Sequence, residues 1–390
     1  MRGPFIEIID IRLFTLASGS ADESGADSGE SQYWGGSWYN DEALANPMSP
    51  YPAPTSDHTF WQGPGQDPFA IEIELANGTV GVAANYGGGH YACDIIDTHL
   101  RRFIEGASVF DTERIWDQMY RSQLPADQGG LYHMAMSGVD LALWDAKGTV
   151  TGQPVYNLIG GMVSEEVPCY VTASPSILDH VADEGFLGVK LAMPAAASDG
   201  RAGLCEIEET VAKAHERLAP DTELMLECYM GWDREFTVRL AERIWEYDVK
   251  WIEDPLLPDH AEARYADIKP DVRPIQLAAG NLAFGQRSLH RLLADGAVDI
   301  LQPEIQWVGG LTETCRIANM AKPHDVPVVP HCAGIYNYHF VVAHTNAPFA
   351  EYIVPGDGTV IEPIFDAVSG EPFRRTGRSA SIRHLASAST

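Results

Sequence analysis

Short apolar segments alternate with amphipathic segments along the chain from about residue 130 onwards, in repeats of about 25 to 30 residues. This period is typical of a strand followed by a helix. The predicted strands are 168–172, 187–192, 223–228, 249–253, 275–279, 298–302, 326–330 and 349–354. Eight strands with helices between them predict a (β/α)₈ barrel. A doubly wound open sheet is the alternative, but no Gly-rich phosphate loop follows the first strand.

The N-terminal part of the chain has a different pattern. Residues 5–14 predict a strand, and residues 69–83 alternate apolar and polar positions around Asn77-Gly78, which predicts a hairpin. Residues 94–120 predict a helix. We therefore expect a small α+β domain before the barrel.

Two segments of this part predict loops. Residues 16–32 consist of Gly, Ser, Ala and acidic residues with almost nothing to bury, so we expect them to be flexible. Residues 32–68 are rich in Pro and aromatic residues, and a loop of this length in an enzyme is usually a lid. An insertion without a function is the alternative, and it suits 16–32 better than 33–61.

Composition narrows the class of protein. Asp and Glu number 55 against 26 Lys and Arg, so the net charge is -29, which disfavours binding to nucleic acid or to anionic membrane surfaces. No apolar run reaches the roughly 20 residues of a membrane-spanning helix, and the first residues lack a signal peptide, so we expect a soluble, cytoplasmic protein. Six scattered cysteines without a CxxC pair indicate neither a disulfide framework nor a thiolate zinc site.

The acidic surplus also suits a halophilic protein. Excess surface carboxylates hold hydrated cations, and strong salt screens their mutual repulsion. Only six of the 26 basic residues are Lys. An ordinary acidic cytosolic protein is the alternative, because net charge reports solubility and not fold.

Polar residues end or directly follow the predicted barrel strands, where the active site of such a barrel lies. They are Lys190, Glu227, Glu253, Asn281, Glu304, His331 and Glu351. Glu227, Glu253 and Asn281 are separated by 26 and 28 residues, one strand–helix unit each, so they are expected on three adjacent strands. Their oxygen donors suit Mg²⁺ better than zinc. For any one of the seven, a helix N-cap or a salt bridge at the barrel rim is the alternative.

The segment 135–161, AMSGVDLALWDAKGTVTGQPVYNLIGG, resembles the signature of the mandelate racemase/muconate lactonizing enzyme group of the enolase superfamily. The later segments KWIEDPLLP, DILQPEIQWVGGLTE and VVPHCAGIYNYH follow the order found in its acid-sugar dehydratases, the subgroup of L-rhamnonate dehydratase. The resemblance covers about residues 30 to 370. It implies an N-terminal α+β capping domain over a modified (β/α)₇β barrel, and homo-oligomers, commonly octamers.

Three parts of the chain follow from this resemblance. They are a capping domain with lid loops at 1–125, a catalytic barrel at 126–360, and a C-terminal segment at 361–390 that returns to the capping domain and ends in a partly flexible tail.

The resemblance also implies roles for the strand-end residues. Glu227, Glu253 and Asn281 take the three Mg²⁺-ligand positions, and Glu304 and His331 take the positions of an Asp–His dyad. His331 is then the base that removes the proton α to a carboxylate, and elimination of the β-hydroxyl gives a 2-keto-3-deoxy sugar acid.

Further residues are expected to contact the substrate, a sugar acid. Lys190 and Glu351 would hydrogen-bond its carboxylate or enolate oxygens. His58 falls near the position of a substrate-binding Arg, and His339 is a further candidate. Trp38, with Tyr39 and Trp61, is expected to seal the pocket, although aromatic residues in a loop often only pack.

Four positions depart from the family pattern. Glu227 and Glu304 stand where Asp is usual, Asn281 stands where Glu or Asp is usual, and Ala192 replaces the second Lys of the racemases' KxK pair. Asn281 removes one negative charge from the metal site, while the two Glu side chains are one methylene longer. Two alternatives therefore stay open: an epimerase or another acid-sugar specificity of the superfamily, and a non-catalytic paralogue with a degraded metal site.

Overall fold

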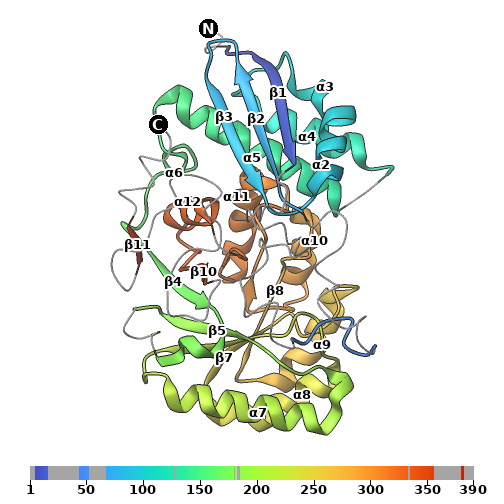
Figure 1. Cartoon of the computed structure of the whole chain (residues 1–390), viewed down its shortest axis with the longest axis vertical. Helices are drawn as coiled ribbons and strands as arrows, with labels where there is room; N and C mark the ends of the chain where they lie inside the picture. The colour runs from blue at the N-terminus through green and yellow to red at the C-terminus, as the bar shows by residue number, and fades with distance from the viewer. Residues whose placement is uncertain are drawn as a thin grey trace, which may run out of the picture.

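The computed structural model describes residues 5–15, 44–51, 67–126, 129–179, 181, 185–332, 334–354 and 379–381. The predicted loop at 16–32 lies outside these residues, as do most of the predicted lid and most of the C-terminal segment. Figure 1 shows a small sheet at one end of the molecule and the helices α7 (Gly200–Arg217) and α8 (Arg234–Ile244) at the other.

The small sheet is antiparallel, with the strand order β1 (Ile8–Thr15), β2 (Phe69–Leu75) and β3 (Val80–Asn85). The predicted hairpin at Asn77-Gly78 is confirmed, since Leu75 N donates to Thr79 O across the turn. Gly78 has a φ of 84°, a left-handed conformation that glycine adopts without strain. Alternate residues of β2 are buried, as its apolar pattern predicts.

The prediction that residues 94–120 are helical is confirmed except for a break between Ile104 and Thr112. Helix α2 (Gly89–Ile95) continues through a π-helical turn (Ile96–Leu100) into α3 (Arg101–Ile104), and α4 (Thr112–Gln123) begins only after a break. The break has a physical cause, because the intervening backbone pairs with β1. Gly106 N donates to Ile8 O and Ile8 N donates to Ala107 O, both at 2.9 Å.

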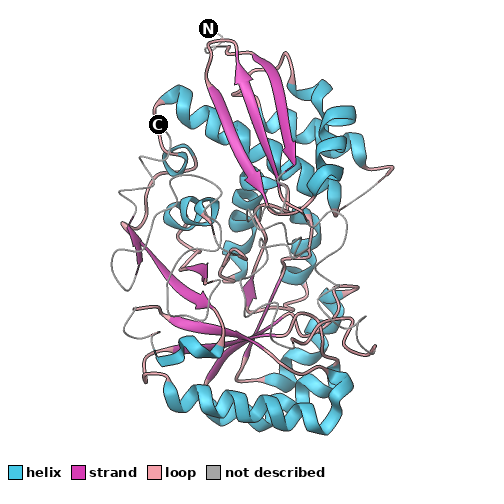
Figure 2. Ribbon diagram, viewed as in Figure 1, coloured by secondary structure: helices cyan, strands magenta, loops and turns pink. Residues whose placement is uncertain are grey.

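The barrel strands are parallel and follow the predicted positions closely. They are β4 (Glu166–Thr172), β5 (Gly188–Ala192), β6 (Glu223–Glu227), β7 (Val249–Glu253), β8 (Gln276–Ala279), β9 (Ile300–Leu301) and β10 (Ala350–Ile353). The sheet runs β10-β4-β5-β6-β7-β8-β9 and curls on itself, so the prediction of a modified barrel with a small α+β domain is confirmed (Figure 2).

Helices follow the strands and cover the sheet. After α7 and α8 come α9 (Ala261–Val272), α10 (Gly285–Ala294), α11 (Gly310–Ala321) and α12 (Ile335–Ala343), and the short α6 (Val155–Leu158) precedes β4. The strand β11 (Ser379–Ser381) adds to β4 in the antiparallel sense. No helix in the described part of the chain is long and apolar enough to cross a membrane.

The predicted strand at 326–330 is wrong as a regular strand. Its contact with β9 is a single bridge, between Leu301 and Val328. Pro327 and Pro330 flank this point, and a proline cannot donate a backbone hydrogen bond to a ladder. The segment still fills the place between β9 and β10 that completes the barrel.

The barrel interior is a separate apolar layer. Each member comes from a different barrel segment, and the members are Tyr170, Met225, Trp251, Ala278, Ile300 and Val329, with Phe349 packed against them. Trp251 and Phe349 stack with their ring centroids 6.1 Å apart. This layer closes the barrel below the ends of the strands.

Helix α5 (Leu131–Thr151) lies between the small sheet and the barrel and is mostly buried. It approaches β3 closely, since a Cβ on Gly81 would lie 2.4 Å from Ala142 O. On its other side, the buried Asp140 reaches the first turn of α11 and accepts hydrogen bonds from Thr312 N at 2.9 Å and Thr312 Oγ1 at 2.5 Å. Burial raises the pKa of Asp140 to about 7. This bond ties the capping side of the molecule to the barrel.

Replacing Thr312 by Val is expected to lower the free energy of unfolding by about 1–3 kcal/mol, because a buried carboxylate loses a donor. Urea unfolding measures the change. Thr314→Val is the matched control on the same helix, since the Thr314 hydroxyl bonds only the backbone of Gly310. We expect the control to lose about 1 kcal/mol or less, and equal losses in the two variants would contradict the role given to Asp140.

Candidate active site

A ring of polar side chains lies one inward-facing position beyond the apolar layer. Side chains alternate along a strand, so a residue two positions after an interior residue also faces inward. The ring consists of Thr172, Glu227, Glu253, Gln302, His331 and Glu351, each two residues after a member of the layer, and Lys190 on β5. The carboxyl ends of the barrel strands therefore hold these groups together.

Lys190 is the centre of this ring. Its ammonium lies 2.6 Å from Glu253 Oε1, 3.0 Å from Glu351 Oε1 and 3.2 Å from Glu227 Oε2. All four side chains are at most 2% exposed, so the attraction acts with little screening by water. Burial alone would lower the pKa of Lys190, but the surrounding carboxylates raise it well above its usual value. The structure thus brings four of the predicted residues into contact.

The carboxylates are not equivalent. Burial raises the pKa of Glu227 well above its usual value, and the neighbouring Glu253 adds to this effect. Burial also disfavours the charge on Glu253, but Lys190 outweighs it and lowers the pKa of Glu253 to about 2. When all three are ionised, three carboxylates face one ammonium, which leaves two excess negative charges. A divalent cation would neutralise this excess.

Asn281 lies two residues beyond β8, the strand next to β7, which ends in Glu253. Its Oδ1 atom is buried and has no hydrogen-bond partner among the described residues. Its side chain bonds the buried carboxyl of Asp254, whose pKa is raised to about 7 by burial and by Glu253. An acceptor left unpaired inside a protein needs a partner that the protein does not supply.

These donors fit a hard divalent cation. Two carboxylates and an amide oxygen are the ligand types that Mg²⁺ prefers. In the described part of the chain, no three His, Cys, Asp or Glu side chains form a metal-binding group, so a site with three ligands here would need a donor of another type, such as an amide oxygen. The substitution at 281 removes a charge from the site but leaves an oxygen donor in place.

The backbone is strained directly after β6 and β7, the strands that end in Glu227 and Glu253. Tyr229, Met230 and Asp254 have φ values of 42°, 58° and 42°, which residues other than glycine rarely adopt. The turn after β6 lets Tyr229 N donate to Glu227 Oε1 at 2.9 Å. The chain therefore bends sharply where it presents its carboxylates.

Glu304 and His331 form the predicted dyad. His331 Nδ1 lies 2.9 Å from Glu304 Oε2, and the other carboxylate oxygen accepts from Gln306 N at 2.9 Å. Burial lowers the pKa of His331, but Glu304, and to a smaller extent Glu351, raise it above the usual value overall. With Nδ1 held by the carboxylate, Nε2 is the ring atom available to a substrate.

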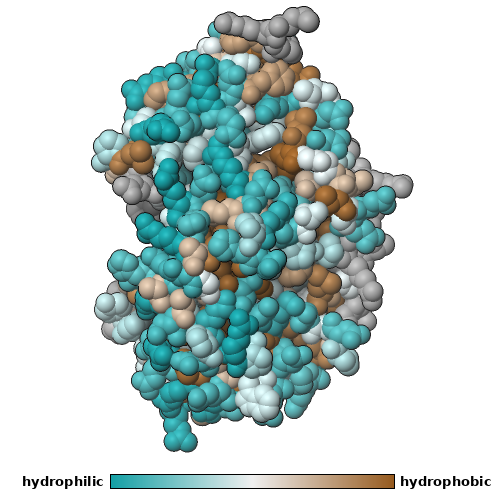
Figure 3. All heavy atoms as spheres, turned by 180° about the vertical axis from the view of Figure 1, so that it is seen from behind, coloured by the Kyte–Doolittle hydropathy of each residue, from teal (hydrophilic) through white to brown (hydrophobic). Residues whose placement is uncertain are grey.

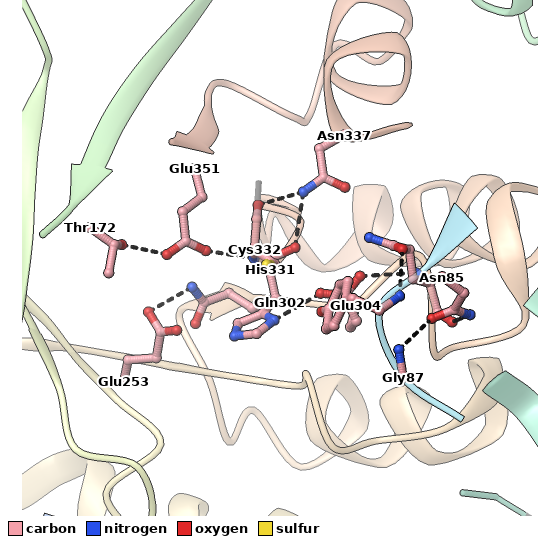
Figure 4. A network of polar contacts seen from close by, with 12 residues as sticks. Asn85, Gly87, Thr172, Glu253, Gln302, Glu304, His331, Cys332, Asn337 and Glu351 are labelled. Carbon is pink, nitrogen blue, oxygen red and sulfur yellow. Dashed lines mark hydrogen bonds and ion pairs between the residues drawn. The ribbon is translucent and has the colours of Figure 1, made fainter. Parts of the chain in front are cut away.

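The capping domain holds this dyad in place through a set of contacts that we call the cap clasp, formed by Asn85, Tyr86 and Gln306. Asn85 Nδ2 donates to Gln306 O at 2.5 Å, and Tyr86 N donates to Gln306 Oε1 at 3.2 Å. Figure 4 shows the polar network running from the cap through Glu304 and His331 towards Glu253. The end of β3 thus fixes the loop that carries Glu304.

Glu351 is held from two further sides. Thr172 Oγ1 donates to its Oε1 atom, and Cys332 N donates to Oε2 at 2.6 Å. The Asn337 side chain in turn bonds the backbone oxygens of His331 and Cys332 at 2.9 and 2.6 Å. The segment that carries His331 is therefore fixed by helix α12 as well as by β10.

His339 does not join the other predicted residues. It lies on α12, and its Nδ1 atom accepts a hydrogen bond from Tyr156 N at 3.2 Å while its ring stacks on Tyr156. Burial lowers the pKa of His339 to about 4. His58, Trp38, Tyr39 and Trp61 lie outside the described residues.

Sequence reasoning missed Thr172, Gln302, Asp254 and the cap clasp. Thr172 and Gln302 do end apolar strands, so the two-residue offset from the apolar layer was a usable signal for them. Asp254 directly follows a predicted ligand. The cap clasp joins positions 220 residues apart in the chain, and no local sequence pattern predicts such a contact.

Family models match both parts of the chain. Residues 46–160 match the N-terminal domain of mandelate racemase / muconate lactonizing enzyme, and residues 176–379 match the enolase C-terminal domain-like model. A protein of Saccharopolyspora erythraea named L-rhamnonate dehydratase is 36% identical over 378 residues, which cover 96% of this chain and 93% of that protein.

Solved structures agree with these matches. The rhamnonate dehydratase of Gibberella zeae complexed with Mg has a TM-score of 0.88 and 32% identity, covering 98% of this chain and 93% of that one. A racemase of Streptomyces coelicolor with bound magnesium has a TM-score of 0.67 and 25% identity, covering 76% and 93% of the two chains.

Replacing Lys190 by Met is expected to lower the free energy of unfolding by about 3–5 kcal/mol in chelator at about pH 8, because three buried carboxylates lose their cation. The loss should shrink towards about pH 5, since burial raises the pKa of Glu227 and Lys190 no longer lowers that of Glu253, so these two carboxylates take up protons as the pH falls. Chemical unfolding at the two pH values measures both effects.

Lys250→Met is the control for this prediction. Lys250 pairs with the partly exposed Glu223 at 2.6 Å, so its loss should change the free energy of unfolding by about 1 kcal/mol or less. A Lys190→Met protein as stable as this control would show that the buried ammonium is not needed to keep the carboxylates together.

Proposed function

The chain belongs to the mandelate racemase/muconate lactonizing enzyme family of enolase-like proteins, and we propose on this basis that it is a Mg²⁺-dependent sugar-acid dehydratase of the L-rhamnonate dehydratase type. The observation that carries the proposal is the arrangement of His331 and Glu304 opposite Glu227 and Glu253 in one buried ring. A base on one side and cation ligands on the other suit removal of a proton next to a carboxylate.

Glu227, Glu253 and Asn281 would hold the Mg²⁺ ion. When bound, the ion supplies positive charge that offsets the negative charge developing on the substrate carboxylate as its α-proton leaves. Lys190, fixed among the carboxylates, adds a second positive charge on the same side. With the ion bound, the two excess negative charges of the ring would be neutralised, so the substrate carboxylate would meet two cations and no uncompensated carboxylate charge.

His331 acts as the base. Its Nε2 atom takes the proton from the α-carbon, and the electron pair of the broken C–H bond passes into the enolic form of the carboxylate. Glu304 holds the Nδ1 proton and stabilises the imidazolium that results. Gln306 N donates a hydrogen bond to the second oxygen of Glu304, and this bond holds the carboxylate in its orientation towards His331.

The same histidine completes the elimination. The enolic electron pair forms the carbon–carbon double bond, the bond from the β-carbon to its hydroxyl breaks, and the His331 proton converts the departing hydroxide to water. The enol then tautomerises to a 2-keto-3-deoxy acid. One base is sufficient for this sequence, which agrees with Ala192 in place of a second lysine.

The remaining parts of the proposal concern the surroundings of the site. His58 and Trp38 would contact the substrate from the segment 32–68, whereas His339, whose Nδ1 atom accepts a hydrogen bond from Tyr156 N, is left out of the proposed substrate contacts. We assign residues 1–125 to the capping domain, 126–360 to the barrel and 361–390 to a segment that returns to the cap.

The chain is further proposed to work as a cytoplasmic homo-oligomer, such as an octamer, in a salt-rich cell. The excess of acidic residues supports the last point. Hydrophilic side chains also cover most of the face that Figure 3 shows.

Replacing His331 by Asn is expected to lower dehydration by about 100-fold or more, because the base is lost. The measurement is a keto-acid assay over a panel of aldonic acids at high KCl, with Mg²⁺ present. His344→Asn is the control, since the ring of this buried histidine bonds the Phe340 backbone and, among the described residues, no group of the proposed site. An undiminished rate in His331→Asn would refute the mechanism.

The same panel separates the alternatives. Deuterium exchange at the α-carbon without keto acid would favour an epimerase. Absence of both Mg²⁺ binding and keto acid in the unaltered protein would favour a non-catalytic paralogue.

Replacing Asn281 by Ala is expected to weaken Mg²⁺ binding at least about tenfold, because the third oxygen donor is removed. Titration calorimetry measures the affinity without reference to turnover. Asn346→Ala is the matched control: Asn346 also has a buried, unpartnered Oδ1 atom among the described residues, and its amide nitrogen bonds Ala318 O. Equal affinity in Asn281→Ala and the unaltered protein would remove Asn281 from the ligand set.

A further inference from the structure

We propose that Gln302 is a substrate-binding residue whose side-chain carbonyl oxygen accepts a hydrogen bond from a hydroxyl group of the bound acid. This inference rests on the proposed function, because it names a contact that a polyhydroxy acid would make in that site. Gln302 directly follows β9 and is 1% exposed.

The orientation of the Gln302 amide is set by its neighbour. Its Nε2 atom donates to Glu253 Oε2 at 2.8 Å, and Trp251 Nε1 donates to the same oxygen at 3.0 Å. The other oxygen of Glu253 lies 2.6 Å from the Lys190 ammonium, and a carboxylate paired with an ammonium in this way accepts hydrogen bonds. The NH₂ group must therefore face Glu253, and the carbonyl oxygen must face away from it.

That carbonyl oxygen lacks a partner within the part of the chain that the structure describes. Gln302 Oε1 is buried and makes no hydrogen bond with any described residue. An unpaired buried acceptor costs free energy unless something else satisfies it. Figure 4 shows the Gln302 side chain between those of Glu253 and His331. The free oxygen is therefore placed between a proposed cation ligand and the proposed base.

The neighbouring strand leaves this space open. Gly280, directly after β8, stands between Glu253 and Gln302 in the strand order and has no side chain. Its φ of 134° and the 3.0 Å approach of Leu289 to a Cβ at this position disfavour any other residue. Gln302 can thus reach across β8 to Glu253 and keep its oxygen facing the ring.

A substrate hydroxyl is the donor that fits this position. In the proposed reaction the α-carbon must lie within reach of His331 while the carboxylate faces the cation ligands. The hydroxyls on the α- and β-carbons are then the substrate donors nearest to a point between His331 and Glu253. An amide oxygen suits them, because it accepts a hydrogen bond without adding a charge beside Glu253.

The test compares binding of an aldonic acid with binding of its 2-deoxy and 3-deoxy analogues, by calorimetry at saturating Mg²⁺. The unaltered protein should bind one of the analogues at least about tenfold more weakly than the parent acid. Gln302→Met should bind the parent acid about tenfold more weakly and lose most of that discrimination. Gln302→Glu, which in its protonated form keeps both a donor and an acceptor, should restore discrimination.

Trp251→Phe separates substrate binding from support of Glu253. It removes the other donor to Glu253 Oε2, so it should weaken Mg²⁺ binding but retain discrimination between the acid and its analogues. Discrimination in Gln302→Met equal to that of the unaltered protein would overturn the proposal. The proposal would also be overturned if Gln302→Met kept its discrimination but showed a shifted pH profile of kcat/KM. The oxygen would then act by positioning His331.

Failure of the proposed function has a different signature. The unaltered protein would then form no keto acid and bind no member of the acid panel, and the role of Gln302 would fall with it. If the unaltered protein dehydrates an acid and only the Gln302 variants behave unexpectedly, the proposed function stands and this inference alone is wrong.

Discussion

The structure depends on a single buried ammonium group. Three carboxylates from three barrel strands converge on Lys190, whose ammonium contacts all three and lowers the pKa of Glu253. One positive charge does not balance three negative charges, and the imbalance is what suits the ring to a divalent cation. The same groups therefore stabilise the carboxyl end of the barrel and give it the charge that a divalent cation would neutralise. The depressed pKa of Glu253 and the raised pKa of Glu227 show how unevenly the charge is shared.

The register of the parallel strands explains how much of the candidate site could be predicted from the sequence. Glu227 and Glu253 end apolar strands, and strand ends meet at one mouth, so the sequence alone placed them together. Gln302 was not predicted, because it is uncharged and its place in the site follows from its contact with Glu253. The seventh strand was predicted from its apolar residues, although the prolines beside Val328 prevent a regular ladder. Local pattern therefore predicts which segments approach the site better than it predicts their hydrogen bonds.

Contacts between distant parts of the chain could not be predicted in this way. The helix expected over 94–120 breaks because Gly106 and Ala107 pair with β1, almost 100 residues earlier in the chain. Asp140 belongs to the segment that indicated the family, yet its bonds to Thr312 follow only from the fold. The resemblance identified the reaction class, while the structure shows which neighbours hold each reacting group.

The cap clasp has a consequence for how such proteins diversify. Asn85 ends the small sheet and Tyr86 directly follows it, whereas Gln306 belongs to the barrel. Gln306 N holds the carboxylate of Glu304, which contacts the proposed base His331. Cap and barrel are thus not exchangeable modules: a chimaera that takes them from different parents would mismatch the clasp and loosen Glu304 without altering any reacting residue. Recombination that preserves activity should therefore cross over inside the cap or inside the barrel, and inherit both sides of the clasp from one parent.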